Sequence, residues 1–274
     1  MSEEDELYEQ VRIESPHILF IDKLYEYTPE FINNIQMDVK VIMFHNICEG
    51  GFLSSVFILP AAHVSDDVLK DSRWISGGVE LYHGYEYVIV NKGLISANRR
   101  KLPDREAPNI VITTGGSDPA GVLIKILMGL PEAIEVPFTV TALVGEAFLH
   151  WEELNSMEPL LGSNIQIKAY DVEELTKASF AIATFGVSSY ELLYLNIPFL
   201  SVGHSLRNAE GSRNLSLKCS SLIDLGYIEV LEKESFQIAF NDMLTRYDKL
   251  ENTGCIVDGK GVERIAKIIL ETTP

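Results

Sequence analysis

Two adjacent glycines follow an apolar run near the middle of the chain and precede a segment with helical spacing. The turn consists of Gly115, Gly116, Ser117 and Asp118. Glycines let the backbone approach a ligand closely, and a helix N-terminus offers unpaired N–H groups with positive partial charge. These features suit a pyrophosphate. A tight turn without a ligand, in which Ser117 or Asp118 caps a helix that holds Pro119 in its first turn, explains the same residues equally well.

A second loop of this kind follows the apolar run at residues 180–184 and contains Gly186, Ser188 and Ser189. Ligands of open parallel sheets bind at the carboxyl ends of the strands, so this loop is expected at the same edge as the first. Glu191 can accept hydrogen bonds from both hydroxyls of a ribose. The spacing Ser188-x-x-Glu191 also matches a capping box, in which the glutamate bonds back to the backbone, and the residues alone favour that cap.

Three further side chains follow strands at positions where a cleft residue would lie, and each can act as a base. Asp22 follows the first expected strand, His45 follows the second, and His204 follows the run at 199–202. If the protein hydrolyses its substrate, the attacking water needs such a base. Asn208, close to His204, would project into the same cleft. A single histidine in a loop is more often an ordinary residue than a catalytic one.

The elements that must position these residues alternate between short apolar runs and helix-length segments. Continuous apolar strands separated by helices indicate an α/β fold with a parallel sheet covered on both faces. The expected strands are 17–21, 39–44, 56–59 and 85–90 in the first half, and 109–113, 138–144, 165–169, 180–184, 199–202 and 227–231 in the second. Residues 91–108 are polar, basic and proline-containing, and we interpret them as a linker.

Composition limits the class of protein. The 274 residues suit two domains, because domains cluster near ~100–150 residues. A net charge of −18 disfavours nucleic acids and membrane surfaces as partners, although backbone N–H groups can still hold one small anion. The acidic start is unlike a signal peptide, and no apolar run approaches the ~20 residues of a membrane span, so we expect a cytoplasmic protein.

The three cysteines point to the same compartment. Cys48, Cys219 and Cys255 lie far apart and form no CxxC pair. We therefore expect free thiols in a reducing compartment and no metal site.

Three motifs in one order resemble a known family. They are TGGSDP at 114–119, SSYELL at 188–193 followed by NIP at 196–198, and DGKG at 258–261 followed by ERI at 263–265. Together they resemble the UDP-sugar hydrolase of pseudaminic acid biosynthesis and its spore coat polysaccharide relatives, which are similar to the C-terminal half of the lipid II N-acetylglucosaminyltransferase. The resemblance covers residues 108–270 well. It implies a glycosyltransferase B fold of two Rossmann-like domains, with the nucleotide-sugar bound mainly by the second.

The resemblance also implies a role for individual residues. Gly115, Gly116 and Ser117 would face the diphosphate, with Asp118 in the same turn. Ser188 and Ser189 would lie near the phosphates and Glu191 would hold the ribose. Ala169 and Tyr170, after the run at 165–169, would border the uracil, and Asn208 would lie near the sugar. No cofactor is implied beyond the UDP-sugar itself, as substrate or ligand.

One departure from the family concerns the first domain. The family begins with a glycine-rich turn carrying Gly-His-x-x-Arg, whose histidine is the catalytic base. Here the only such string is at 203–207, in the other domain. Four expected strands precede the linker, where a complete unit has about six. We therefore expect an incomplete N-terminal domain at 1–107 and a complete nucleotide-sugar-binding domain at 108–274.

Two hypotheses for function follow. The first is a nucleotide-sugar enzyme, of hydrolase or glycosyltransferase type, in surface polysaccharide or nonulosonic acid biosynthesis. The second is a non-catalytic nucleotide-sugar-binding protein or subunit. In that case a partner protein or a second copy would supply the missing first strands, because an uncovered sheet edge invites pairing.

Overall fold

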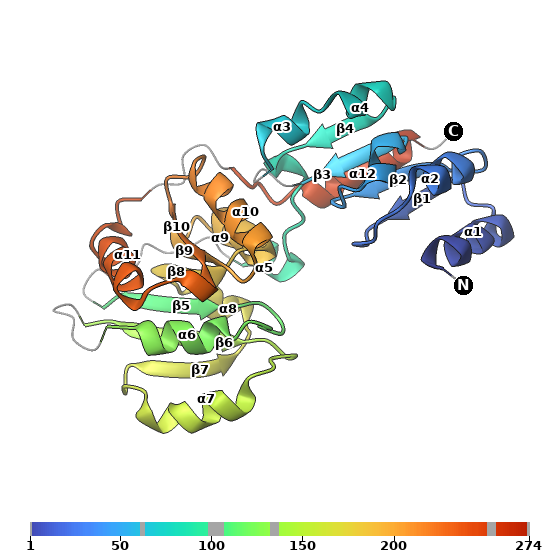
Figure 1. Cartoon of the computed structure of the whole chain (residues 1–274). Coiled ribbons are helices and arrows are strands. Elements are labelled where there is room, and N and C mark those ends of the chain that lie inside the picture. The colour runs from blue at the N-terminus through green and yellow to red at the C-terminus, as the bar shows by residue number, and fades with distance from the viewer. Residues whose placement is uncertain (1, 61–63, 98–106, 132–136, 251–255, 273–274) are drawn as a thin grey trace. The chain divides into compact units, whose positions relative to one another are not determined.

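The chain forms two compact units, which are described separately. A computed structural model describes residues 2–60, 64–97, 107–131, 137–250 and 256–272. Unit 1 comprises Met1–Ile89 together with Asp258–Pro274, and unit 2 comprises Val90–Val257 (Figure 1). This division differs from the expected domains at 1–107 and 108–274, because the end of the chain packs in unit 1.

Unit 1 is built on a parallel sheet, to which the described residues contribute four strands in the order β1-β2-β3-β4. The strands are β1 (Ile18–Ile21), β2 (Lys40–Phe44), β3 (Val56–Leu59) and β4 (Glu80–His83). The helical segments are α1 (Glu3–Glu14), α2 (Pro29–Ile35), η1 (Glu49–Leu53), α3 (Asp66–Leu69), α4 (Ser72–Ser76), η2 (Tyr85–Tyr87) and α12 (Gly261–Thr272). As expected, Thr28 caps α2 and Pro29 opens it.

Alternate residues of β2 pack on opposite faces of this sheet. Val41 and Met43 belong to a core shared with α1 and α2, whereas Ile42 and Phe44 pack with α12. The preceding turn holds α12 in place, since Arg264 donates to both carboxylate oxygens of Asp258 (2.8 and 2.6 Å) and to the Glu86 carbonyl (2.9 Å). The Arg264 guanidinium lowers the pKa of Asp258 to about 2. Thus the DGKG segment is a turn that docks the last helix.

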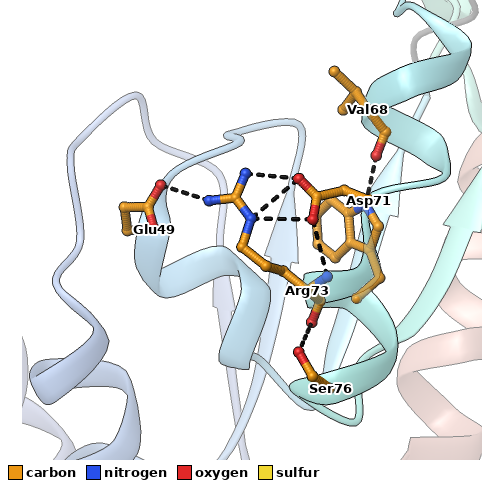
Figure 2. Close-up of polar contacts among 6 residues, drawn as sticks. Glu49, Val68, Asp71, Arg73 and Ser76 are labelled. Carbon is orange, nitrogen blue, oxygen red and sulfur yellow. Dashed lines mark hydrogen bonds and ion pairs between the residues drawn. The ribbon is translucent and has the colours of Figure 1, made fainter.

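A second ion-pair cluster ties α4 to η1 (Figure 2). The Arg73 guanidinium donates to Asp71 at 2.7 Å and to Glu49 at 2.8 Å. It also lies 3.9 Å above the ring centre of Phe52. The neighbouring Trp74 indole donates to the Val68 carbonyl at 2.8 Å. We interpret this cluster as structural, because the Arg73 and Trp74 donors all have acceptors within unit 1.

The fourth strand of unit 1 lies earlier than expected. The prediction placed it at 85–90, but β4 is Glu80–His83 and Tyr85–Tyr87 form a 3₁₀ turn. Gly84 has a φ of +126°, which turns the chain out of the sheet directly after His83. The aromatic run was therefore wrongly assigned as a strand, because its residues pack as a turn.

Unit 2 is built on a sheet to which the described residues contribute six parallel strands, in the order β10-β9-β8-β5-β6-β7. The strands are β5 (Asn109–Thr113), β6 (Thr139–Val144), β7 (Ile165–Ala169), β8 (Phe180–Thr184), β9 (Phe199–Gly203) and β10 (Leu222–Tyr227). The helical segments are α5 (Lys92–Ser96), α6 (Val122–Gly129), α7 (Trp151–Met157), η3 (Glu158–Leu160), α8 (Val172–Thr176), α9 (Val187–Tyr194), α10 (Leu206–Ser216), η4 (Ile228–Val230) and α11 (Lys233–Arg246). Part of the expected linker at 91–108 is thus α5, and 98–106 lie outside the described residues.

Two neighbouring strands of unit 2, β8 and β9, are buried along their whole length. Every residue of β8 and β9 is buried, as expected of a parallel sheet with both faces covered. Helices α6 and α11 pack on one face, where Phe236 and Phe240 join the core formed by Ile110, Ile112 and Phe180. Helix α10 packs on β9 and β10.

The last strand of unit 2 also differs from the prediction. It was expected at 227–231, but β10 is Leu222–Tyr227 and the chain continues into a 3₁₀ turn at Ile228–Val230. Residues 222–227 include Asp224 and Gly226, which interrupt the apolar pattern and hid the strand. The Asp224 carboxylate is instead satisfied by Ser212, which donates to it at 2.6 Å.

The cysteines are not all free thiols. Cys48 is a buried free thiol, whereas Cys219 is disulfide-bonded, so the expectation of free thiols is wrong for Cys219. Cys255 lies outside the described residues. None of the helices in the described ranges has the length and apolar character needed to cross a membrane.

Candidate nucleotide-binding edge of unit 2

The strand order of unit 2 creates a switch point between β5 and β8. From β5 the chain runs through α6 to β6 on one side, and from β8 it runs through α9 to β9 on the other. The loops after β5 and β8 therefore diverge above neighbouring strands. In open parallel sheets, ligands bind in the crevice left at such a point, at the carboxyl ends of the strands. Both glycine-containing loops singled out in the sequence lie there.

The turn after β5 has the backbone that its glycines allow. Gly115 has a φ of +81°, and a side chain on Gly115 or Gly116 would meet no atom within 4 Å. The space above the turn is therefore open on the side of these two residues. Beneath the turn, Gly145 lies so close that a Cβ there would be 2.4 Å from the Gly116 carbonyl oxygen. The Ser117 carbonyl accepts from Leu149 N–H at 3.1 Å, which fixes the other end of the turn.

Asp118 supports this turn from inside the protein. The residue is 1% exposed, and its two carboxylate oxygens accept from the N–H groups of Val122 (2.9 Å) and Leu123 (2.8 Å). Helix α6 therefore begins at Val122, three residues later than the expected start at Pro119. Because the Asp118 carboxylate occupies the positive end of α6, that end is not open to a phosphate. This differs from the expectation that Asp118 contacts the ligand.

The loop after β8 opens a helix with free space above it. Helix α9 begins at Val187, and the Gly186 N–H donates to the Ser189 hydroxyl at 3.4 Å. A side chain on Gly186 would meet no atom within 4 Å. Ser189 is fully buried and Ser188 is half-buried. Ser188 is thus the residue of this loop that offers a hydroxyl near the surface.

Glu191 does not form the capping box that its spacing suggested. It is the fifth residue of α9, whereas a capping-box glutamate is the third, so it lies one turn too far along the helix. The residue is 7% exposed, and the Tyr170 hydroxyl lowers the pKa of its carboxyl group. The interpretation of Glu191 as a cap is therefore wrong. A buried carboxylate needs hydrogen-bond donors, and Tyr170 supplies one.

Tyr170 reaches Glu191 from the outer strand of the sheet. It follows β7, and its N–H donates to the Val144 carbonyl at 2.9 Å, which holds it to the end of β6. Burial raises the pKa of Tyr170 to about 12, and the charge of Glu191 adds to this effect. Burial likewise raises the pKa of Glu191, and the Tyr170 hydroxyl opposes that shift.

The loop after β9 lies beside the loop after β8. Gly203 packs against helix α10, so that a Cβ there would lie 2.3 Å from the Ala209 nitrogen. Ser205 caps α10, and the Asn208 side-chain amide donates to the Phe185 carbonyl at 3.1 Å. Asn208 therefore ties the two loops together. His204 is half-buried in the same loop.

The three candidate bases belong to different units. Asp22 and His45 are exposed residues of unit 1 that follow β1 and β2 at the same edge of its sheet, and His204 belongs to unit 2. His45 has a φ of +64°, in the left-handed region that few non-glycine residues adopt. Neither unit by itself brings the three together. Ala169 is exposed at the end of β7, next to Tyr170.

Sequence reasoning missed Gly145 as a residue of this edge. It follows β6 directly, just as Gly115 follows β5 after one residue, and it lets the turn at Gly115 and Gly116 pack closely against the end of β6. The available signal was a glycine directly after the apolar run at 138–144, which matches the position of Gly115 after the run at 109–113. The sequence alone does not show that β5 and β6 are neighbours in the sheet, and this pairing is what brings Gly145 against Gly115 and Gly116.

Comparison with known proteins gives the fold of the whole chain. No protein-family model matches. The chain is similar to the spore coat polysaccharide biosynthesis protein SpsG of Bacillus subtilis, with 24% identity over 208 residues, which are 73% of this chain and 61% of that protein. It resembles the structure of S. aureus MnaA with UDP (TM-score 0.63, 14% identity, 98% of this chain and 80% of that one).

It also resembles the spinosyn rhamnosyltransferase SpnG with thymidine diphosphate (TM-score 0.61, 14% identity, 97% and 73%). The fold is therefore that of the glycosyltransferase B architecture, with two parallel α/β sheets, as the sequence predicted. The aligned region spans about three fifths of the length of the curated relative from B. subtilis.

Proposed function

We propose that unit 2 binds a nucleotide-sugar, with UDP as the nucleotide, and that the chain acts as an enzyme of hydrolase or glycosyltransferase type in surface polysaccharide or nonulosonic acid biosynthesis. The observation that carries this proposal is the buried carboxylate of Glu191 beside the switch point of the sheet. It does not cap its helix, and the Tyr170 hydroxyl lowers its pKa against the effect of burial. The similarity to SpsG supports the proposed pathway.

The diphosphate would lie between the turn at Gly115 and Gly116 and the start of α9. Both places have open space above the backbone. The N-terminus of α6 is neutralised by Asp118, so the start of α9, with the Ser188 hydroxyl, is the better source of donors and of positive helix dipole. This arrangement moves the proposed phosphate site from the start of α6 to the start of α9.

The nucleoside would extend from the phosphates toward the end of β7. Glu191 would accept hydrogen bonds from the two ribose hydroxyls, and Ala169 and Tyr170 would border the uracil. Asn208 would lie near the sugar, although its amide already donates to the Phe185 carbonyl. Ser117 is half-buried and would face the diphosphate, whereas Ser189 is fully buried and would take part through the backbone of its loop.

In either reaction the UDP leaving group gains negative charge as the sugar departs. N–H groups directed at that charge stabilise the transition state, and they do so without reorganisation because the fold fixes them in advance. Hydrolysis further needs a base for water, and Asp22, His45 and His204 are the candidates. Replacing all three without loss of turnover would remove them from the mechanism.

A non-catalytic binding subunit is the second candidate, and it is favoured by the edge position of β1. The outer side of β1 pairs with no strand among the described residues. A partner chain or a second copy could extend the sheet there. Release of UDP from UDP-sugars by the purified chain alone supports the enzyme. Turnover only with a partner, or binding without turnover, supports the subunit.

Titration calorimetry tests the binding proposal. We expect UDP to bind more tightly than ADP or GDP, and the Glu191→Ala protein to bind UDP at least tenfold more weakly, since hydrogen bonds to a charged group are worth about 1.5–3 kcal/mol. Glu234→Gln, an exposed change at the start of α11, is the matched control. Absence of UDP binding by the unmodified protein would contradict the proposal.

A further inference from the structure

Four strands in the described ranges lie at the edges of the two sheets, namely β1, β4, β7 and β10. Exposed strand edges invite pairing with other chains, and proteins usually protect them with charged residues or bulges. Three of these strands are protected in this way, by Glu80 in β4, by Lys168 in β7, and by Asp224 with a shift of register in β10. Strand β1 has the sequence ILFI and contains no such residue. It is therefore the edge best suited to accept another strand.

The outward backbone groups of β1 belong to Ile18 and Phe20. The His17 carbonyl accepts from the Lys40 N–H at 3.2 Å, so His17 faces β2, and the alternation of a parallel ladder makes Leu19 face β2 as well. The N–H and C=O groups of Ile18 and Phe20 consequently point away from β2. No hydrogen bond to these four groups is found among the described residues. A neighbouring strand would supply their partners.

Helix α1 does not take the place of a neighbouring strand. Its first turn bonds to the segment after β1, where the Glu4 carboxylate accepts from the Thr28 N–H at 2.6 Å. Its buried residue Val11 joins the core that α2 forms on one face of the sheet. A helix in this position helps to cover that face, but it satisfies none of the outward backbone groups of β1.

We propose that β1 pairs in antiparallel orientation with β1 of a second copy of this chain, across a twofold axis, so that the two sheets become one. In this pair, Ile18 of each copy faces Phe20 of the other, and the two residues exchange both of their hydrogen bonds. This register satisfies the outward groups of both strands. Leu19 of each copy then lies opposite Leu19 of the other, at the axis. Pairing of this kind is independent of nucleotide binding by unit 2.

The residues beyond the ends of β1 favour an antiparallel second copy. Asp22 follows the strand and would lie opposite Pro16 of the other copy, next to His17, so no two like charges meet along the ladder. Parallel pairing in register would instead place two Asp22 carboxylates side by side, which is unfavourable. Antiparallel pairing also brings the end that holds Ile13 toward the end that holds Leu24. These apolar residues are 75% and 74% exposed, and a second copy would give each of them an apolar neighbour.

The first test measures the mass and the hydrogen exchange of the unmodified chain over a range of concentrations. Sedimentation equilibrium should show a dimer, with twice the 30.6 kDa mass of the chain. The amides of Ile18 and Phe20 should exchange more slowly by about tenfold or more where the dimer forms, because hydrogen bonding protects an amide. The Leu81 amide faces outward from β4, at the other edge of the same sheet, and should not change. A monomer at every concentration overturns the proposal and leaves this edge to a different chain.

A cysteine in place of Leu19 tests the register. Opposite residues that exchange no hydrogen bonds in an antiparallel pair have Cα atoms about 4.5 Å apart, which a disulfide can bridge. Mild oxidation should therefore convert most of Leu19→Cys into a covalent dimer. The unmodified chain gives the background from the native cysteines. Leu81→Cys is the matched control, because Leu19 and Leu81 are both half-buried against the same core and lie at opposite edges of the sheet.

Circular dichroism checks that the cysteine variants fold, and the exchange measurement on the unmodified chain decides the question if they do not. If the chain is a dimer but the Ile18 and Phe20 amides exchange equally at all concentrations, another surface forms the dimer and the proposal is wrong. The same follows if Leu81→Cys crosslinks as readily as Leu19→Cys. If the dimer and the Leu19→Cys crosslink form but the chain binds no nucleotide, the strand pairing stands and the proposed function fails.

Discussion

The hydroxyl of Tyr170 lowers the pKa of the Glu191 carboxyl group, although the two residues follow strands separated by two others in the sheet of unit 2. A contact of this kind is a product of the fold, because nothing in the local sequence around either residue requires it. It distinguishes a carboxylate kept for a ligand from one that caps its own helix. The predictions below concern this edge, the residues that support it, and the ion pair that holds α12 in unit 1.

Replacing Glu191 by glutamine should change the pH dependence of stability. Burial raises the folded-state pKa of Glu191 above its unfolded value. The stability that this shift contributes is present below the unfolded pKa and is lost as pH rises through the folded pKa. Glu191→Gln should therefore be at least as stable as the unmodified protein at neutral pH, and the difference should shrink on acidification. Urea unfolding at several pH values measures this, and a clear loss of stability at neutral pH would contradict it.

Replacing Asp118 by alanine should destabilise unit 2. The change removes both hydrogen bonds to the first turn of α6 and places alanine at a φ of +46°. Loss of such a cap costs about 0.5–2 kcal/mol, and the left-handed backbone adds about 1 kcal/mol. Asp118→Asn should cost less, because asparagine tolerates this backbone and can still accept one bond. Denaturant unfolding measures both.

The matched control for Asp118 is Glu229→Gln, which disrupts only the exposed ion pair with Lys125. An exposed pair is worth ~1 kcal/mol at most. Equal losses for the alanine variant and the control would show that Asp118 does not support the helix.

Replacing Gly145 by alanine should weaken binding of the phosphates without removing recognition of the nucleoside. The new Cβ would lie 2.4–2.7 Å from backbone atoms of Gly115 and Gly116, so the turn must move. We expect the affinity for UDP to fall by about tenfold, a change of about 1.4 kcal/mol, and that for uridine to change little. Calorimetry with both ligands tests this. Gly162→Ala, where the nearest atoms belong to the movable Asn164 side chain, is the control.

Replacing Arg264 by methionine should loosen α12 from the rest of unit 1. Arg264 lowers the pKa of Asp258 to about 2, so the ion pair stabilises the fold above the unfolded pKa of an aspartate and is lost as pH falls toward 2. Both side chains are about one third exposed, so solvent limits the effect to ~1 kcal/mol. Hydrogen exchange of the α12 amides should be faster in Arg264→Met at neutral pH. Lys267→Met, an exposed change on the same helix, should leave it unchanged.

The sequence predicted the parallel sheets and both glycine loops, because continuous apolar runs and glycine turns are local signals. The prediction from sequence was wrong where the local pattern favours one structure and the rest of the fold imposes another. The aromatic run at 85–90 has strand composition, yet Gly84 turns it away from the sheet. The Ser188–Glu191 spacing matches a capping box, but the helix begins at Val187, which shifts the glutamate along the helix.

The sequence identified the residues of the candidate site, but it did not show which of them support the loops and which remain available to a ligand. Asp118 is of a residue type that is common in ligand-binding turns. Only its burial and its two backbone partners show that it supports the start of α6. The contact between Tyr170 and Glu191 depends on the strand order, which periodicity does not reveal. The same holds for α12, whose apolar stripe shows that it is amphipathic but not which sheet it covers.

The return of α12 to unit 1 imposes an order on folding during synthesis. Ribosomes produce the first four strands early, yet the face formed by Ile42, Phe44, Val56 and Ile58 lacks its covering residues Ile265 and Ile268 until the last helix has been made. Unit 2, a continuous segment, can fold completely in the meantime. Unit 1 is thus the first to be started and the last to be finished. A chain terminated before residue 261 would leave a complete second unit attached to a sheet with one bare apolar face, which is a target for chaperones and proteases.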